Sequence, residues 1–188
     1  MLATSGSRSL RTDALRDRLA RPATGFGADA YYFFDRSREW LLPGQVSGSR
    51  GQGSVEALER VQRFSSRYFQ RPDAGTYRLD TTRTFLDGWS ASAAFGRQSG
   101  NVRVDTSFYA ISPGFEVNEL GYQTRSDRVG GEISLNWRKL QPDKYTRTRE
   151  IDLTRSWMAN FEGQRQGGDW NLNGGATLLN YWNLGFNI

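Results

Sequence analysis

The sequence of 188 residues contains no cysteine and no histidine. Their absence excludes disulfides, thiol nucleophiles, histidine-based metal sites and Ser-His-Asp triads. No run of about eighteen apolar residues occurs either, so a transmembrane helix is excluded. Carboxylates remain, and they leave an acid–base pair or a site for a hard cation chemically open. No cofactor is expected from these residues, and catalysis is less expected than a structural or transport role.

Lysine is nearly absent, at positions 139 and 144 only, so arginine supplies almost all of the 25 basic residues. Against 20 acidic residues these give a net charge of +5. The arginines are dispersed, and most have Asp or Glu as neighbours, unlike the basic stripe of a nucleic-acid-binding protein. The pattern favours a solvated, arginine-rich β-surface and predicts no nucleic-acid partner.

The N-terminal stretch "MLATSGSRSLRTDALRDRLARP" lacks the apolar core of a secretory signal. Within it, residues 11–20 are a weak helix or loop candidate that ends before Pro22. Because an exported protein needs a signal, an exported role would make this chain an excerpt of a longer protein.

Glycine (21 residues) and aromatic residues (13%) are abundant, a mixture typical of strands joined by tight turns. The segments "ADAYYFFD" and "EWLLPGQVSGS" predict a hairpin across "RSR". Residues 54–70 interrupt this pattern, because Val55, Leu58 and Val61 have helical spacing behind the capping residue Ser54. We expect a short helical or loop excursion there, followed by a turn at "RPDAG".

From residue 84 onward, apolar and polar residues alternate strictly. In residues 129–138, for example, Val129, Ile133 and Leu135 oppose polar neighbours such as Ser134 and Asn136. The same period recurs in residues 89–96, 102–110, 150–161 and 170–188, with a turn expected near Asn180 that splits the last run. The fold class predicted is therefore all-β, an antiparallel meander of about eight strands.

Many of these strands are about ten to fifteen residues long, whereas strands of globular proteins have a mode of about five to six. Transmembrane β-strands have about nine to eleven residues, so the pattern favours a segment of an outer-membrane β-barrel with its apolar face in lipid and its charged face in the lumen. Four residues near strand ends are expected to form the aromatic girdles: Trp89, Trp137, Trp157 and Trp182. A soluble barrel or sandwich is the alternative, because alternation alone does not show which face of the sheet contacts water.

Three motifs resemble one family: "GSVEALERVQRFSSRYFQRPDA", "LDTTRTFLDGW" and "SPGFEVNELGY" with "RSD" after it. It is the uncharacterised C-terminal barrel domain of bacterial proteins that carry an N-terminal family-9-like carbohydrate-binding module. Glu119 stands where that family usually has Asp. The resemblance implies a barrel in the bacterial outer membrane, similar in general build to TonB-dependent receptors, and it carries over no catalytic residue.

The carbohydrate-binding module of that family is absent here, and family members continue past "NYWNLGFNI" with further strands. Ile188 also stands where many outer-membrane barrels have a C-terminal aromatic residue. We therefore expect residues 1–188 to be an internal fragment, a partial barrel domain without signal peptide or carbohydrate-binding module. Its expected partners are the lipid bilayer, the remainder of the same barrel and glycans.

The segment "SPGFEVNELGY", residues 112–122, interrupts the strands. Pro113 ends the preceding strand because proline cannot donate to a ladder, and Phe115, Val117 and Leu120 supply an apolar anchor. Glu116, Asn118 and Glu119 are free to pair with arginines such as Arg125 and Arg128, or to contact a cation or ligand. In "QRPDA", Arg71 and Asp73 are further candidate contacts, although a turn is the simpler interpretation.

The function expected from the sequence is a non-enzymatic outer-membrane barrel for uptake of glycans or other nutrients, or for surface display. The alternative is a carbohydrate-active hydrolase, or a glycan-binding β-protein, with Glu116 and Glu119 as its carboxylates. Glycosidases use two carboxyls about 5–10 Å apart, one of them with a raised pKa. Neighbouring arginines would lower both pKa values instead, which favours the non-enzymatic interpretation.

Overall fold

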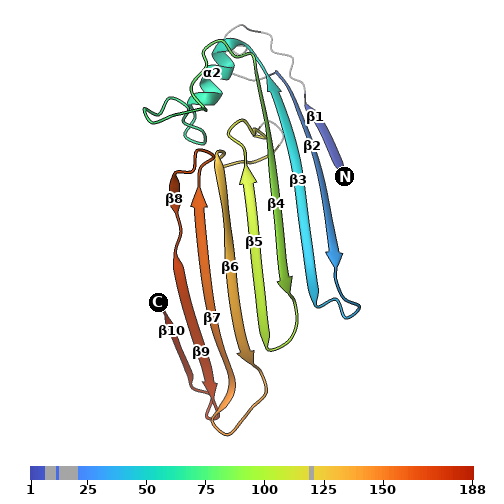
Figure 1. The fold of residues 1–188 in the computed structure, drawn as a ribbon, viewed down its shortest axis with the longest axis vertical. Helices are drawn as coiled ribbons and strands as arrows, with labels where there is room; N and C mark the ends of the chain where they lie inside the picture. Colours follow the sequence, from blue (N-terminus) through green and yellow to red (C-terminus); the bar gives the residue numbers. More distant parts are fainter. Residues whose placement is uncertain (7–11, 13–20, 119–120) are drawn as a thin grey trace.

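The computed structural model of the chain describes residues 1–6, 12, 21–118 and 121–188. These residues form one antiparallel sheet of ten strands with a helical cap at one end (Figure 1). The elements in chain order are β1 (Leu2–Gly6), β2 (Arg21–Phe33), β3 (Trp40–Gln52), α2 (Val55–Arg63), β4 (Phe85–Arg97), β5 (Val102–Ile111), β6 (Arg128–Lys139), β7 (Thr146–Ala159), β8 (Arg165–Gly167), β9 (Trp170–Leu178) and β10 (Asn183–Asn187).

The strands follow one another as a meander, in the order β1-β2-β3-β4-β5-β6-β7-β9-β10, with β8 paired to β7. The predicted all-β meander, the hairpin of β2 with β3 and the turn before β10 are confirmed. The expected number of about eight strands is wrong. The described residues form ten, because β1 and β8, of five and three residues, are too short to give a periodic signal, whereas β10 is the strand expected after the turn near Asn180.

The interruption after β3 contains a helix, as its spacing predicted. The Ser54 hydroxyl accepts a hydrogen bond from the Ala57 amide at 3.2 Å, which caps α2. The helix ends at Arg63, and residues 64–84 continue as turns and loops. One face of α2 is buried in a cluster of Ala57, Leu58, Phe69 and Leu86, against which Val61, Tyr77 and Leu79 pack. The candidate helix at residues 11–20 lies outside the described residues.

The strand register separates apolar from polar side chains across the whole sheet. Val46 pairs with both Ala28 and Ala91, and Leu135 pairs with both Val104 and Leu153, so like residues share a face from strand to strand. On the other face the same rows read Gln45 beside Ser92 and Asn136 beside Asp152. The apolar face carries many exposed large side chains: Tyr32, Val46, Trp89, Phe108, Ile133, Leu135, Ile151 and Phe186.

The connections differ sharply between the two ends of the sheet (Figure 1). At one end the strands are joined through residues 34–39, 98–101, 140–145 and 179–182, four to six residues each. At the other end the connections are residues 53–84, 112–127 and 160–169, and these carry α2 and β8. In an antiparallel meander, successive connections alternate between the two ends of the sheet. The three long connections therefore lie at the same end.

The sheet is open in the part of the chain that the structure describes, with β1 at one edge and β10 at the other. Closure into a barrel is therefore not a property of these strands by themselves. Among the same residues, no helix has the length and apolar content needed to span a membrane.

Candidate functional site

The long connections pack together into one body, here called the cap, made of residues 53–84, the described part of 112–127, and 160–164. The cap contacts the sheet on its polar face. Leu86 of β4 points to that face and joins the core of α2, and Ser49 of β3 accepts a hydrogen bond from the Glu116 amide at 2.9 Å. The cap therefore covers the polar face at one end of the strands, and it reaches the apolar face only where the Phe161 ring meets Trp89 edge-on at 5.7 Å.

A buried ion pair joins two parts of the cap. The Arg67 guanidinium lies 2.6 Å from the Glu116 carboxylate, with side-chain exposures of 0% and 9%. Arg67 also donates to the Phe115 carbonyl at 2.5 Å. Burial lowers the pKa of Arg67 while Glu116 opposes that shift, and an arginine stays protonated in either case. Because removing one partner of a buried pair leaves an uncompensated charge, Arg67 ties residues 112–118 firmly to the segment after α2.

Two glycines let the loop 112–118 lie directly on β4. A Cβ on Gly88 would overlap the backbone N and Cα of Phe115, and one on Gly114 would overlap the Asp87 carbonyl oxygen. The Ser112 hydroxyl accepts from the Trp89 amide at 2.8 Å and continues the ladder one residue beyond β5. The interruption at Pro113 is thus a docking contact between backbones, with the Phe115 ring buried beneath it.

Glu116 and Asn118 organise the loop by local hydrogen bonds. The Glu116 carboxylate accepts from the Asn118 amide at 2.6 Å, and the Asn118 side chain accepts from the Gln123 amide at 2.8 Å. Glu116 pairs not with Arg125 or Arg128, which the sequence offered as partners, but with Arg67, 49 positions before it in the chain. Arg128 instead contacts the Met158 sulfur. Glu119 and Leu120 lie outside the described residues.

Arg71 is the second charged centre of the cap. Its guanidinium lies 2.7 Å from Glu162, 3.2 Å from Asp127 and 3.6 Å from Asp73. Glu162 also accepts from the backbone amides of Gly75 at 2.8 Å and Thr76 at 2.6 Å. These contacts connect three long connections, so "QRPDA" is a turn whose arginine holds the cap together.

The charges around Arg71 shift its pKa and that of its partner in opposite directions. Burial alone would lower the pKa of Arg71, but the hydrogen bond to Glu162 and the charge of Asp127 raise it. For Glu162, burial would raise the pKa, yet the hydrogen bonds from Arg71 and the backbone of residues 75–77 lower it. Both groups are thereby held in their charged forms at neutral pH, which suits an anchor and not a proton donor.

The four tryptophans predicted as girdle residues lie toward the ends of the strands. Trp89 and Trp157 are near the cap end, Trp137 is two residues before the opposite end of β6, and Trp182 lies in the turn between β9 and β10. All four are substantially exposed. A further aromatic group adjoins the turn between β2 and β3, where Phe95 stacks on Trp40 at 5.2 Å and meets Phe34 edge-on at 5.6 Å.

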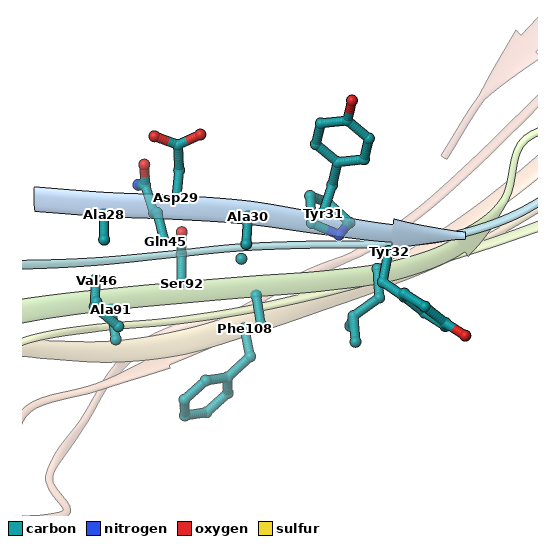
Figure 2. Close-up of a pocket in the computed structure, with 14 residues that line it drawn as sticks. Ala28, Asp29, Ala30, Tyr31, Tyr32, Gln45, Val46, Ala91, Ser92 and Phe108 are labelled. Carbon is teal, nitrogen blue, oxygen red and sulfur yellow. The ribbon is translucent and has the colours of Figure 1, made fainter. Parts of the chain in front are cut away.

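The apolar face is hollowed over β2, β3 and β4. Figure 2 shows Ala28, Ala30 and Ala91 at this hollow, with Tyr32 and Phe108 on the same side of the sheet and Asp29 and Tyr31 on the other. Its volume is about 560 Å³. The hollow forms because the small side chains at its centre, alanine and glycine, do not reach as far from the sheet as the flanking rings of Tyr32 and Phe108.

Several residues of the cap were not identified from the sequence. Arg67, Asp127 and Glu162 are between 49 and 91 positions away from the partners that they bind, so no local spacing reveals the pairs. Within the described residues, no group of acidic side chains could hold a metal ion. The cap is therefore a set of arginine–carboxylate and backbone contacts.

Comparison with known proteins adds one finding. A family model described as "Domain of unknown function (DUF5916)" matches residues 59–188, which include most of the cap and β4 to β10. No curated protein and no solved structure matches the chain.

Proposed function

The chain belongs to this family of unknown function, and we propose that the protein forms part of the wall of a bacterial outer-membrane β-barrel. The observation that carries the proposal is the sheet itself: a continuous apolar face, exposed on every long strand, is backed by a polar face that holds the cap. A soluble protein rarely exposes an apolar patch of this extent. Lipid is the occupant that such a face suits, and its acyl chains also fill the hollow of Figure 2.

Charged residues bound the apolar face at a spacing that fits a bilayer. On β4, nine residues separate Asp87, which pairs with Arg50 at 3.5 Å, from Arg97, which pairs with Glu39 at 3.1 Å. Eleven residues separate Asp127, which directly precedes β6, from Lys139 at the end of that strand. Strands that cross a membrane have about nine to eleven residues between their interfaces.

Arg155 is the exception on the apolar face, at the register position opposite Ile133. Its guanidinium stacks on the Trp170 ring, 5.1 Å from the ring centre. A cation–π contact and the long side chain reduce the cost of a charge at this position. Trp170 thus stabilises the charge of Arg155 on this face.

The lengths of the connections predict the orientation of the barrel in the outer membrane. Outer-membrane barrels have short periplasmic turns and longer extracellular loops, so the cap faces the outside of the cell and the four short turns face the periplasm. Because the chain lacks cysteine, single replacements report this directly. On intact cells an impermeant maleimide should label Thr76→Cys in the cap and not Gln98→Cys in a short turn; labelling of position 98 alone would reverse the orientation.

The open edges at β1 and β10 need partners, because unpaired backbone groups are not tolerated in the hydrocarbon region. The remainder of the same barrel supplies them in this proposal. Its role is non-enzymatic, in uptake of glycans or other nutrients or in surface display. Support for a non-enzymatic role comes from Glu116 and Glu162, whose carboxylates are engaged by Arg67 and Arg71.

The experiment compares two neighbouring arginine substitutions on β6 in the full-length protein. Leu135→Arg should destabilise the folded barrel by about 2–4 kcal/mol, because it places a charge on the lipid face near the bilayer midplane. Asn136→Arg should be far milder, since position 136 is on the polar face beside Asp152. Unfolding in phospholipid vesicles measures both. Equal effects, or the reverse order, would contradict lipid contact.

A further inference from the structure

The polar face carries a second hollow, distinct from that of the apolar face and from the cap. Its volume is about 420 Å³, and its polar lining comes from four adjacent strands: Asp29, Tyr31, Gln45, Ser92, Ser107 and Tyr109. A smaller hollow of about 190 Å³ adjoins it through the shared residues Pro43, Ala94 and Ser107, and adds Asp105 and Glu132. Together they form one groove along the strands, here called the polar groove.

The register explains why the groove is there. Asp29, Gln45, Ser92 and Tyr109 occupy one row across β2 to β5, and Tyr31 and Pro43 begin the next row. Small or short residues at Ser92, Ala94 and Gly96 form the floor, while the tyrosines of β2 and β5 stand at its sides. Figure 2 shows Asp29, Tyr31, Gln45 and Ser92 on this side of the sheet.

The polar side chains of the groove make no hydrogen bond or ion pair with other described residues. In contrast, several polar residues elsewhere on the same face bind one another. Ser47 and Ser90 are 2.6 Å apart between the groove and the cap, Ser134 donates to Asp152 at 3.2 Å, and Asn187 bonds to Asn173. Among the described residues, the groove is thus a part of this face whose hydrogen-bonding side chains have no protein partner and can bind another molecule.

The chemistry of the lining specifies the kind of molecule. Carboxylates at Asp29, Asp105 and Glu132 only accept hydrogen bonds, so they suit hydroxyl or ammonium donors. No arginine or lysine lines the groove among the described residues, so anions are repelled. The Tyr31 ring, 72% exposed, offers an apolar surface on which a flat C–H face can stack.

We infer that the polar groove binds a hydroxyl-rich, saccharide-sized ligand that carries no negative charge. The inference rests on the proposed function, because a polar face that lines a barrel lumen is where a transported solute passes. Its volume lies in the range of small-molecule sites, about 300–1,000 Å³. The cap, docked two rows away at Ser49, stands between the groove and one end of the lumen.

The test measures binding by calorimetry with the purified full-length protein in detergent. The probes are maltotriose, cellotriose and mannotriose as neutral trisaccharides, and trigalacturonic acid as the anionic one. At least one neutral probe should bind and the anionic probe should not. Tyr31→Ala and Glu132→Gln should each weaken that binding about tenfold or more, since stacking and a hydrogen bond to a charged group are lost.

Matched controls are available on the same protein. Tyr122→Ala removes an exposed tyrosine, 87% exposed, from the cap, and Glu150→Gln removes a carboxylate from the polar face of β7 outside the groove. Both should leave the dissociation constant within about twofold. Absence of binding by all neutral probes, equal loss in variants and controls, or tighter binding of trigalacturonic acid would overturn the inference.

The outcome is independent of the membrane test. Binding in detergent reports the groove alone, whereas the arginine substitutions on β6 report the lipid face. If Leu135→Arg destabilises the protein in vesicles as expected but no trisaccharide binds, the proposed function stands and the ligand-binding role of the polar groove is wrong. If a neutral trisaccharide binds through Tyr31 and Glu132 but the two arginine substitutions have equal effects in vesicles, the polar groove is a binding site on a sheet that does not span a membrane.

Discussion

Two arginines, Arg67 and Arg71, hold together segments that are far apart in the chain. Each is largely buried and engages carboxylates from a different long connection. The sequence showed that arginines have acidic neighbours, but neighbours in sequence are not the partners in space. The sequence singled out Glu116 as a candidate contact, but its partner Arg67 could not be found without knowing which connections share one end of the sheet.

The double substitution Glu116→Gln with Glu119→Gln separates an anchor from an active site. It removes both carboxylates that a hydrolase would use and leaves Arg67 buried without its counter-charge. Breaking a buried pair costs about 3–5 kcal/mol, so the barrel should assemble less well or melt at a lower temperature. Thermal unfolding of the full-length protein measures this, with the exposed Glu56→Gln of α2 as control.

The opposite result is equally clear. If the double variant assembled and melted like the unsubstituted protein yet no longer cleaved a glycan that the unsubstituted protein cleaves, the loop 112–122 would be catalytic. The non-enzymatic proposal would then be wrong.

At the scale of elements, periodicity was sufficient for the long strands and for α2. Strict alternation predicted β4 to β7 because every second side chain faces the same environment along ten or more residues. β1 and β8, of five and three residues, have too few positions for a period to appear. The docking of the loop on β4 was also not predicted. A glycine in a strand, such as Gly88, does not indicate which backbone segment will pack against it.

Gly88 and Gly51 form a matched pair for testing that docking contact. A Cβ at Gly88 would collide with the Phe115 backbone, whereas a Cβ at Gly51 would meet nothing within 4 Å. Gly88→Ala should therefore release residues 112–118 from β4 and expose the buried Arg67. Limited proteolysis of the full-length protein should then cleave this loop at least about tenfold faster, because the local opening costs less free energy.

Gly51→Ala should leave the rate of cleavage unchanged. Equal rates in the two variants would mean that the close approach of the two backbones does not hold the loop. The contact between Phe115 and the cap core would then be sufficient by itself.

At the scale of the whole molecule, the sequence divided the side chains into two faces but left open which face meets water. Both a soluble sandwich and a membrane barrel produce the same alternation, and they differ only in what covers the apolar side. The structure adds three facts: the apolar face is exposed along the sheet, charged residues bound it, and the cap packs on the polar face. These facts support the membrane interpretation.

The most direct measurement is a cysteine scan along β6, from Ile133 to Asn136, since these 188 residues contain no cysteine of their own. Each variant carries a fluorescent label in vesicles that contain either a lipid-borne or a water-soluble quencher. We expect alternation with a period of two: positions 133 and 135 quenched from the lipid, and positions 134 and 136 from water. Quenching of positions 133 and 135 by neither reagent, or by the water-soluble one alone, would contradict a lipid-facing sheet.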